Sequence, residues 1–304
     1  MADTQILPFT AVGNTWEDLT AKAEAFARDQ ARPRGPTHLG LGVASGPDGL
    51  GLALIFSRRP VALAPLPAQL PARGLAVRGR ARQPETLTAL WLGPCAGGAD
   101  DGCAGAPTAL AVHRPGPREV RIDLPATRRA GRYLFQMLSP GPRGPEVVAA
   151  WTFTRGKAAG AWPPPAPRAP SEDAAGARAL VDAARGEADL PPLGVDPALD
   201  AAAQAHAEAM CRAKVTGHQL PGGAPPDVRA RAAGYRGVVR ENVARAQSVG
   251  QAHLNLLLSP SHRAALMDPA AEDLGIGVAT APGGEGLTES RCVVQLFGRG
   301  AGQR

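Results

Sequence analysis

The sequence predicts an α+β protein in which an all-β module precedes a helical C-terminal domain that ends in a β-hairpin. Apolar residues recur at helical spacing after residue 173, and six short strand-like segments follow one another between residues 66 and 157. A hairpin sequence near the N-terminus also returns near the C-terminus. With 304 residues, 44% of them hydrophobic, the chain is long enough for two or three domains.

The first segment, residues 1–65, carries the earlier copy of the repeated hairpin. "HLGLGVASGPDGLGLALIFSRR" from His38 resembles "DLGIGVATAPGGEGLTESRCVVQLFGR" from Asp273, with a shorter turn between the strands. The offset of 273 − 38 = 235 residues places Arg263 on Arg28 but His262 on Ala27. Because the segment starts too late to contain an upstream half, we interpret it as the back half of a domain related to the C-terminal one, either degenerate or truncated.

Residues 66–157 alternate short strands with turn residues, which is typical of an antiparallel sandwich. Gly131, Arg132 and Tyr133 open a late strand, where an immunoglobulin-like module places its tyrosine corner. The strands carry no candidate catalytic cluster, so we expect a spacer or docking module. The predicted strands are "LAVRGRA", "TLTALWL", "TALAVH", "EVRIDL", "GRYLFQML" and "VVAAWTF".

The proline-rich residues 158–172 predict a stiff linker, and residues 173–301 a separate domain. Ser171, Glu172 and Asp173 favour the capped start of an alanine-rich helix. A second helix is predicted from Pro197 to Lys214, and "LGIGVAT" with "RCVVQLFG" predicts a closing hairpin.

Charge and hydropathy exclude two classes of partner. The net charge is +6, but 30 of the 33 basic residues are arginines spread along the whole chain, and only 4% of residues are aromatic. A nucleic-acid binder clusters its basic residues and interleaves aromatic ones, so we expect no nucleic-acid partner. No window approaches 18 consecutive apolar residues, so we expect no transmembrane span, and the start "MADTQILPFT" lacks the features of a signal peptide.

The four cysteines leave two interpretations open. Cys95 and Cys103 flank a Gly/Asp loop that a disulfide could close, and Cys211 and Cys292 could pair only if the fold brings them together. The alternative is four reduced, buried thiols. Disulfides are favoured, and they indicate an exported protein whose signal segment is absent from this chain.

Four of the six histidines lie in the C-terminal domain, and two of them form the candidate site. Ser259 and Pro260 predict a helix start that places His262 at its third position. His218 lies in a turn-like context, and Glu241 precedes Asn242 in "VRENVA". Two imidazoles and a carboxylate can hold a divalent ion or transfer protons near neutral pH. The alternative is that each is a local structural residue.

Three further residues are given structural interpretations. His206 lies on the apolar stripe of the second helix, so we expect a packed core residue. His253 is expected to face solvent. Ser259 lies close to His262, but a helix N-cap engages its hydroxyl, and we find no oxyanion hole, so we do not favour a serine nucleophile.

The order of motifs resembles the CAP superfamily, also called SCP-like or cysteine-rich secretory, antigen 5 and pathogenesis-related proteins. The resemblance covers about residues 173–300. It implies a three-layered α-β-α sandwich with a groove lined by His218, Glu241 and His262, and Tyr235 is a further candidate for the lining. The motifs are "PPLGVDPALDAAAQAHAEAMCRAKVTGH", "AGYRGVVRENVA", "LLLSPSHRAALMDPAAEDLGIGVAT" and "VVQLFGRG".

The chain departs from the family pattern at two positions near the groove. Leu256 stands where many members have tryptophan, and Ser259 lies near the position of a second glutamate in animal and plant members. The resemblance implies that His218 and His262 can bind Zn²⁺ or another divalent metal. Such a site would keep three protein ligands, enough for an open, catalytic-type zinc site.

Two functions remain as predictions, both for a secreted, periplasmic or cell-envelope protein of bacterial type. In the first, the groove binds a small apolar or peptide-like ligand, a cell-envelope component or a metal, without turnover. The second is a metal-assisted hydrolase of peptide or cell-wall material with Glu241 as its general base. Whether the protein is an enzyme is left open.

Overall fold

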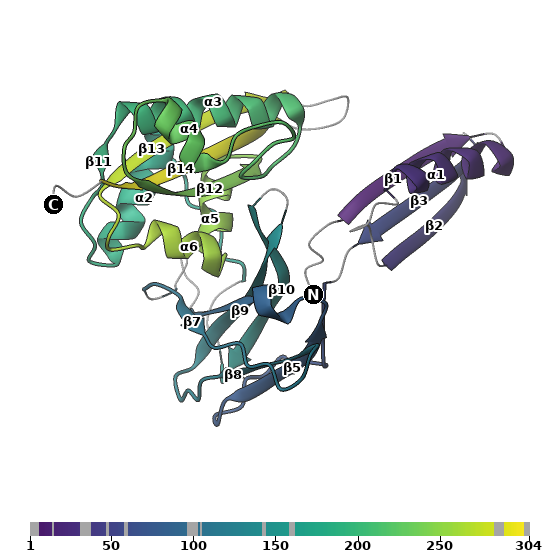
Figure 1. The fold of residues 1–304 in the computed structure, drawn as a ribbon, viewed down its shortest axis with the longest axis horizontal. Coiled ribbons are helices and arrows are strands. Elements are labelled where there is room, and N and C mark those ends of the chain that lie inside the picture. The colour runs from purple at the N-terminus through teal and green to yellow at the C-terminus, as the bar shows by residue number, and fades with distance from the viewer. Residues whose placement is uncertain are drawn as a thin grey trace.

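The computed structural model describes residues 6–13, 15–30, 38–46, 49–57, 60–95, 103, 105–141, 144–157, 162–282 and 289–300. These residues form an N-terminal β-sheet with one helix, a β-sandwich and a C-terminal α-β-α domain (Figure 1). The α+β fold class is confirmed. In the described part of the chain, no helix is long and apolar enough to cross a bilayer.

The N-terminal segment contains β1 (Ile6–Gly13), α1 (Trp16–Gln30), β2 (His38–Gly46) and β3 (Gly49–Ser57). Its sheet has the order β1-β3-β2, and both pairings are antiparallel. The hairpin predicted from the repeat is thus the pair β2–β3. The predicted end at residue 65 is too late, because β4 (Val61–Leu63) pairs with β5 of the following module.

The β-sandwich has a three-stranded sheet, β4-β5-β8, and a four-stranded sheet, β10-β9-β6-β7. All six predicted strands are present. Between the sheets Trp91 stacks on Tyr133, with ring centroids 5.2 Å apart. The Tyr133 hydroxyl donates to the Arg129 carbonyl at 3.0 Å, which is the bond of a tyrosine corner. The remaining bounds are β5 (Leu75–Ala81), η1 (Pro84–Thr86), β6 (Thr88–Cys95), β7 (Thr108–Leu110), β8 (Glu119–Leu124), β9 (Gly131–Gly141) and β10 (Gly144–Arg155).

The C-terminal domain is built on the sheet β11-β13-β14-β12, in which only the short β11 runs parallel to its neighbour. Leu274 and Ile276 pack under α2, α5 and α6. Gly275 and Gly277 point to the other face, where α3 lies so close that an added Cβ would meet its backbone at 2.2 and 2.3 Å. The predicted α-β-α sandwich therefore follows from the alternation of side chains along β13.

The helices of this domain start where their caps predict. Asp173 accepts from the Gly176 N–H and caps α2, and Asp196 caps α3, whose first residue is Pro197. The bounds are α2 (Ala174–Glu187), β11 (Gly194–Val195), α3 (Pro197–Ala213), α4 (Pro226–Ala232), β12 (Val238–Ala246), α5 (Val249–Leu257), α6 (Pro260–Leu266), β13 (Asp273–Ala281) and β14 (Ser290–Arg299).

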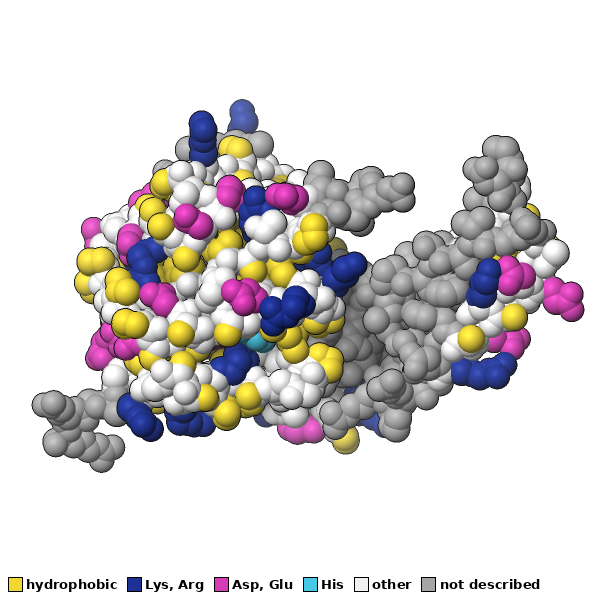
Figure 2. All heavy atoms as spheres, turned by 90° about the horizontal axis from the view of Figure 1, so that it is seen from above, with side chains coloured by type: hydrophobic (Ala, Val, Ile, Leu, Met, Phe, Trp, Pro, Cys, Tyr) yellow, Lys and Arg dark blue, Asp and Glu magenta, His cyan; other side chains and the backbone are white. Residues whose placement is uncertain are grey.

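The surface agrees with the spread of charge along the sequence. On the face of the C-terminal domain seen in Figure 2, acidic and basic side chains are interspersed with apolar ones. On this face the charged side chains of the two signs are mixed and do not form a patch of one sign.

Candidate functional site

The candidate site lies along β12, a strand at the end of the sheet order. Two neighbouring residues of this strand each contact one of the two histidines or its backbone. Successive side chains of a strand point to opposite faces. Glu241 therefore contacts His218, which follows α3, whereas Asn242 donates to the main-chain carbonyl of His262, on α6, at 3.0 Å. In this way residues from both helical layers meet at one strand.

His218 is held by a buried carboxylate. Its Nδ1 lies 3.0 Å from Glu241 Oε1, and the other carboxylate oxygen, Oε2, accepts from the Arg229 guanidinium of α4. Arg229 also donates to the His218 carbonyl at 2.8 Å. Since a carboxylate only accepts, Nδ1 of His218 carries the proton and Nε2 presents a lone pair while the ring is neutral.

His262 is held at the start of α6, at the predicted third helical position. Ser259 occupies the N-cap position and Pro260 is the first helical residue, but the Ser259 hydroxyl makes no cap bond to the helix backbone. It contacts His262 Nδ1 at 2.9 Å instead. The expectation that capping engages this hydroxyl is wrong, because Gln136 Oε1 of the β-sandwich accepts from the Ser261 N–H in its place.

The two imidazoles face each other across a short gap. Their ring centroids are 6.5 Å apart and the planes are inclined by 34°. Burial and, to a smaller extent, His218 lower the pKa of His262 to about 4, so this ring is neutral near pH 7. Among the described residues, the contacts of both rings are made through Nδ1, and neither Nε2 has a hydrogen-bond partner.

The other candidates lie apart from this gap. Tyr235 donates to Asp273 Oδ2 at 3.0 Å and packs with Leu199, so it belongs to the core beside α3. His206 is buried and its Nε2 lies 2.9 Å from the Gly217 carbonyl, as expected of a packed residue. The expectation that His253 faces solvent is wrong, since α5 is covered on several sides and leaves this side chain buried.

The donor set does not fit a zinc site with three protein ligands. Glu241 is the third candidate, but both its oxygens are engaged and its side chain is only 1% exposed. An ion bound to one ring nitrogen lies about 3 Å from the ring centroid, so two rings on one ion have centroids at most about 6 Å apart. No group of three or more metal-ligating side chains occurs among the residues that the structure describes.

Sequence reasoning missed three residues of the site. Arg229 fixes Glu241, and Asn242 fixes the backbone at His262. Gln136 of the β-sandwich contacts Ser259 and Ser261. Asn242 adjoins Glu241 in the motif and could have been found, whereas nothing in the spacing of Gln136 points to a neighbour more than 120 residues away.

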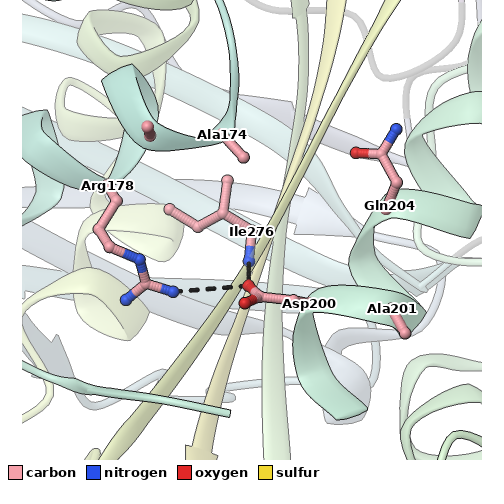
Figure 3. A pocket seen from close by; sticks show the side chains of 7 residues that line it. Ala174, Arg178, Asp200, Ala201, Gln204 and Ile276 are labelled. Carbon is pink, nitrogen blue, oxygen red and sulfur yellow. Dashed lines mark hydrogen bonds and ion pairs between the residues drawn. The ribbon is translucent and has the colours of Figure 1, made fainter. Parts of the chain in front are cut away.

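A second hollow of about 500 Å³ lies on the other side of the domain, between α2 and α3 (Figure 3). Arg178 donates to the Leu274 carbonyl at 2.6 Å, and Asp200 accepts from the Ile276 N–H at 2.8 Å. Gln204 accepts from the Val278 N–H at 3.0 Å. The polar side chains that line the hollow thus bond to free backbone groups at the edge of β13. None of the groove residues lines this hollow.

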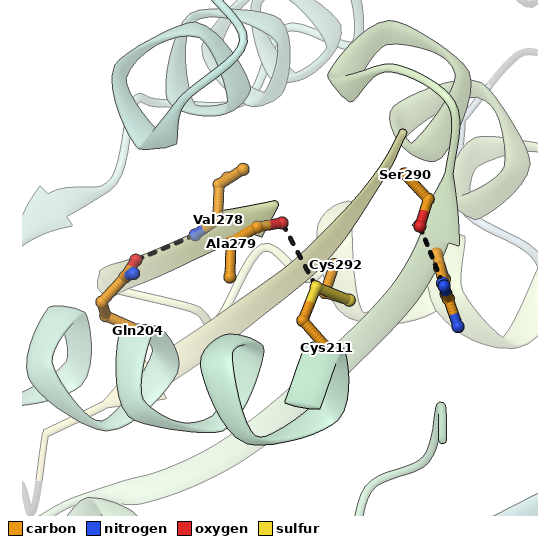
Figure 4. The surroundings of a disulfide bond; sticks show 7 residues. Gln204, Cys211, Val278, Ala279, Ser290 and Cys292 are labelled. Carbon is orange, nitrogen blue, oxygen red and sulfur yellow. Dashed lines mark hydrogen bonds between the residues drawn. A yellow bond between two sulfur atoms is a disulfide. The ribbon is translucent and has the colours of Figure 1, made fainter. Parts of the chain in front are cut away.

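All four cysteines form disulfides, as favoured. Cys95 pairs with Cys103, and Cys211 near the end of α3 pairs with Cys292 on β14 (Figure 4). The second bond joins a helix to the sheet beneath it across 81 residues of sequence. It fixes α3, after which the chain turns toward His218.

The α-β-α sandwich with two facing histidines defines the class of domain, and a family model identifies it. Residues 178–297 match the model described as the cysteine-rich secretory protein family, CAP. The C-terminal domain is therefore a CAP domain, and the predicted resemblance is confirmed. A comparison with curated proteins finds no significant match.

Three solved structures show a more distant likeness. An outer surface protein of Borrelia burgdorferi is 22% identical with a TM-score of 0.34, over 40% of this chain and 88% of that one. An extracellular SCP-domain protein of Bacillus anthracis is 16% identical with a TM-score of 0.38, over 79% and 89%. A cysteine-rich secretory protein of Staphylococcus aureus is 10% identical with a TM-score of 0.32, over 90% and 89%. The family assignment rests on the family model.

Proposed function

We propose that the CAP groove binds a peptide-like ligand at His218 and His262 and releases it unchanged. The observation that carries this proposal is the pairing of two pre-oriented imidazoles, 6.5 Å apart, each held through Nδ1. A peptide N–H can donate to His218 Nε2, and rings that are already fixed lose little entropy on binding. A cell-envelope peptide is one source of such a ligand.

The hydrolase alternative has less support from the site. A general base must reach the proton that it removes, directly or through one water. Glu241 is buried, and its two oxygens are engaged by His218 and Arg229, so its geometry suits holding His218 in place. Turnover through Glu241 would require at least one of these contacts to break.

Binding is tested by titrating the full chain with a tetra-alanine peptide and following the imidazole signals by NMR. We expect the His218 and His262 signals to shift, with binding lost in His218→Ala. His113→Ala is the matched control, because that side chain is 55% exposed and lies in the sandwich. Shifts that survive His218→Ala would contradict the proposal, and cleaved peptide in the mass spectrum would favour the hydrolase.

Metal binding remains a separate proposal for the same pair of rings. Metal analysis of the purified protein with and without His218→Ala tests it. Zinc at one equivalent, lost in the variant, would establish a site that needs the rings to move closer together. Protein free of metal after dialysis against zinc would end that proposal without affecting peptide binding.

We also infer that the protein works in an oxidising compartment, outside the cell or in its envelope. All four cysteines are in disulfides, which persist in such compartments and are rare in the cytosol. The description of the matched family as secretory agrees with this inference. Fractionation of the source cells, followed by thiol labelling of the unreduced protein, tests it.

A further inference from the structure

We infer that the β-sandwich is a cover seated on the CAP groove, which restricts access to His218 and His262. The inference rests on the proposed function only in naming the groove as the binding site. Three contacts, made by Gly144, Gln136 and Arg263, support it.

Gly144, the first residue of β10, lies directly against the His218 ring. A Cβ at this position would come within 2.6 Å of His218 Cδ2, closer than real atoms approach, and the backbone has φ +111°. Cδ2 is bonded to Nε2, the nitrogen that Glu241 leaves unused. Glycine therefore lets the sandwich backbone cover the side of the imidazole that a ligand would approach.

Gln136, on β9, reaches the other half of the groove. This side chain is buried, and its Oε1 accepts from the Ser261 N–H at 2.9 Å. Its Nε2 donates to the Ser259 hydroxyl at 3.2 Å, and that hydroxyl contacts His262 Nδ1. The sandwich thus supplies the cap that α6 lacks and fixes the partner of His262.

Arg263 anchors the opposite side of α6 to the sandwich. Its guanidinium donates to the Gly105 carbonyl at 2.8 Å and to the Cys103 carbonyl at 2.7 Å. Cys103 is bonded to Cys95 at the end of β6, so the disulfide ties one of the two acceptors covalently to that strand. The short helix that carries His262 is therefore held from two sides.

These contacts have a steric consequence. An extended peptide chain cannot lie along β12 and over both imidazoles while the Gly144 backbone occupies the space beside His218. It must first displace the sandwich from this contact, and the free energy of that displacement weakens its binding. A group of a few atoms needs less room.

Histidine carbethoxylation with diethyl pyrocarbonate, read residue by residue by mass spectrometry, measures the cover without any ligand. The full chain supplies its own scale, since His113 is exposed and His206 and His253 are buried. In the wild type we expect His218 to react at least about ten-fold more slowly than His113. Comparable rates would overturn the inference whatever the variants show.

Gly144→Ala is the variant that unseats the cover. We expect His218 to react at least about three-fold faster, with His206 and His253 still protected. Gly156→Ala is the matched control, because Gly156 also has positive φ, +63°, but its nearest neighbour is Ala130 in the sandwich. It should react like the wild type.

Gln136→Leu keeps the inference testable if Gly144→Ala unfolds the domain and exposes His206. It removes both hydrogen bonds to the start of α6 and puts an apolar side chain of similar size in the place of the glutamine. Faster reaction of His262 or His218 supports the cover. Unchanged rates at both histidines in this variant overturn it. Because no peptide is present, failure here leaves the proposed binding function untouched.

Discussion

The N-terminal segment and the back half of the CAP domain share one strand order but differ in what surrounds it. Both have a strand, a helical stretch and a hairpin, ordered β1-β3-β2 and β12-β14-β13. In the segment α1 is one continuous helix. At the offset of 235 residues Ala25 replaces Pro260, and the corresponding stretch of the CAP domain breaks into α5 and α6.

The difference teaches that the hairpin is a scaffold and that the site depends on what is added to it. The break between the two helices makes Pro260 the first residue of α6, and His262 lies in its first turn. His218 and Arg229 come from the half of the domain before β12, which has no counterpart in residues 1–65. The following predictions sharpen this comparison, from the largest expected effect to the smallest.

Removing the Cys211–Cys292 bond should have the largest effect, because it ties α3 to the CAP sheet. The Cys211→Ser, Cys292→Ser double variant should lose about 4.5 kcal/mol of unfolding free energy, from the loop entropy of 81 residues. Denaturant unfolding measures the loss. The matched Cys95→Ser, Cys103→Ser variant removes a bond that closes a loop of only 8 residues, and it should lose about 2.5 kcal/mol. Equal losses would contradict the dependence of stabilisation on loop length.

Gly277→Ala tests the close packing of α3 on β13. The new Cβ would lie 2.3 Å from the Ala203 backbone, so we expect a loss of about 2 to 3 kcal/mol in unfolding free energy. The counterpart at the repeat offset is Gly42, which is exposed, and Gly42→Ala should change stability by less than about 0.5 kcal/mol. Similar thermal shifts in both variants would mean that the two hairpins are packed alike.

His253 tests burial on α5, since its counterpart in the repeat is Asp18, half exposed beside Lys22. Burial first and Arg263 second lower the pKa of His253 to about 4. A lowered histidine pKa means that the unfolded state binds the proton first. Stability is therefore full above about pH 6.5 and falls as pH drops toward 4, by up to about 1.4 kcal/mol per pH unit.

His253→Leu should remove this part of the pH dependence, while the parts due to His206, His262 and the carboxylates remain. Urea unfolding at pH 7, 6 and 5 measures it, with the exposed His113→Leu as the control that keeps the wild-type slope. The same slope in His253→Leu would show that this ring does not titrate on unfolding.

Gln204→Ala should have the smallest effect, about 1 kcal/mol, because it leaves the Val278 N–H without its acceptor. Hydrogen exchange at Val278 should accelerate while exchange at Ile276, held by Asp200, should not. Acceleration at both amides would instead indicate that α3 moves as a whole.

Much of the fold could be predicted, because caps and periodicity are local signals. Asp173 and Pro197 mark helix starts directly, and the motif around Glu241 and His262 led to the site. The burial of His253 could not be predicted, because α5 is only nine residues long and is packed on several sides. Its sequence therefore shows no clear division into a polar and an apolar face. Gln136 could not be found, since docking of two domains leaves no periodic trace in either sequence.

The side chains of Asp200 and Gln204 have a consequence for the solubility of the protein. They occupy amide groups of β13 that would otherwise be offered to any extended chain nearby. Where its own helix occupies these amides, the β13 edge of the sheet cannot pair with a strand of a second molecule, which opposes ordered aggregation through this edge at high concentration.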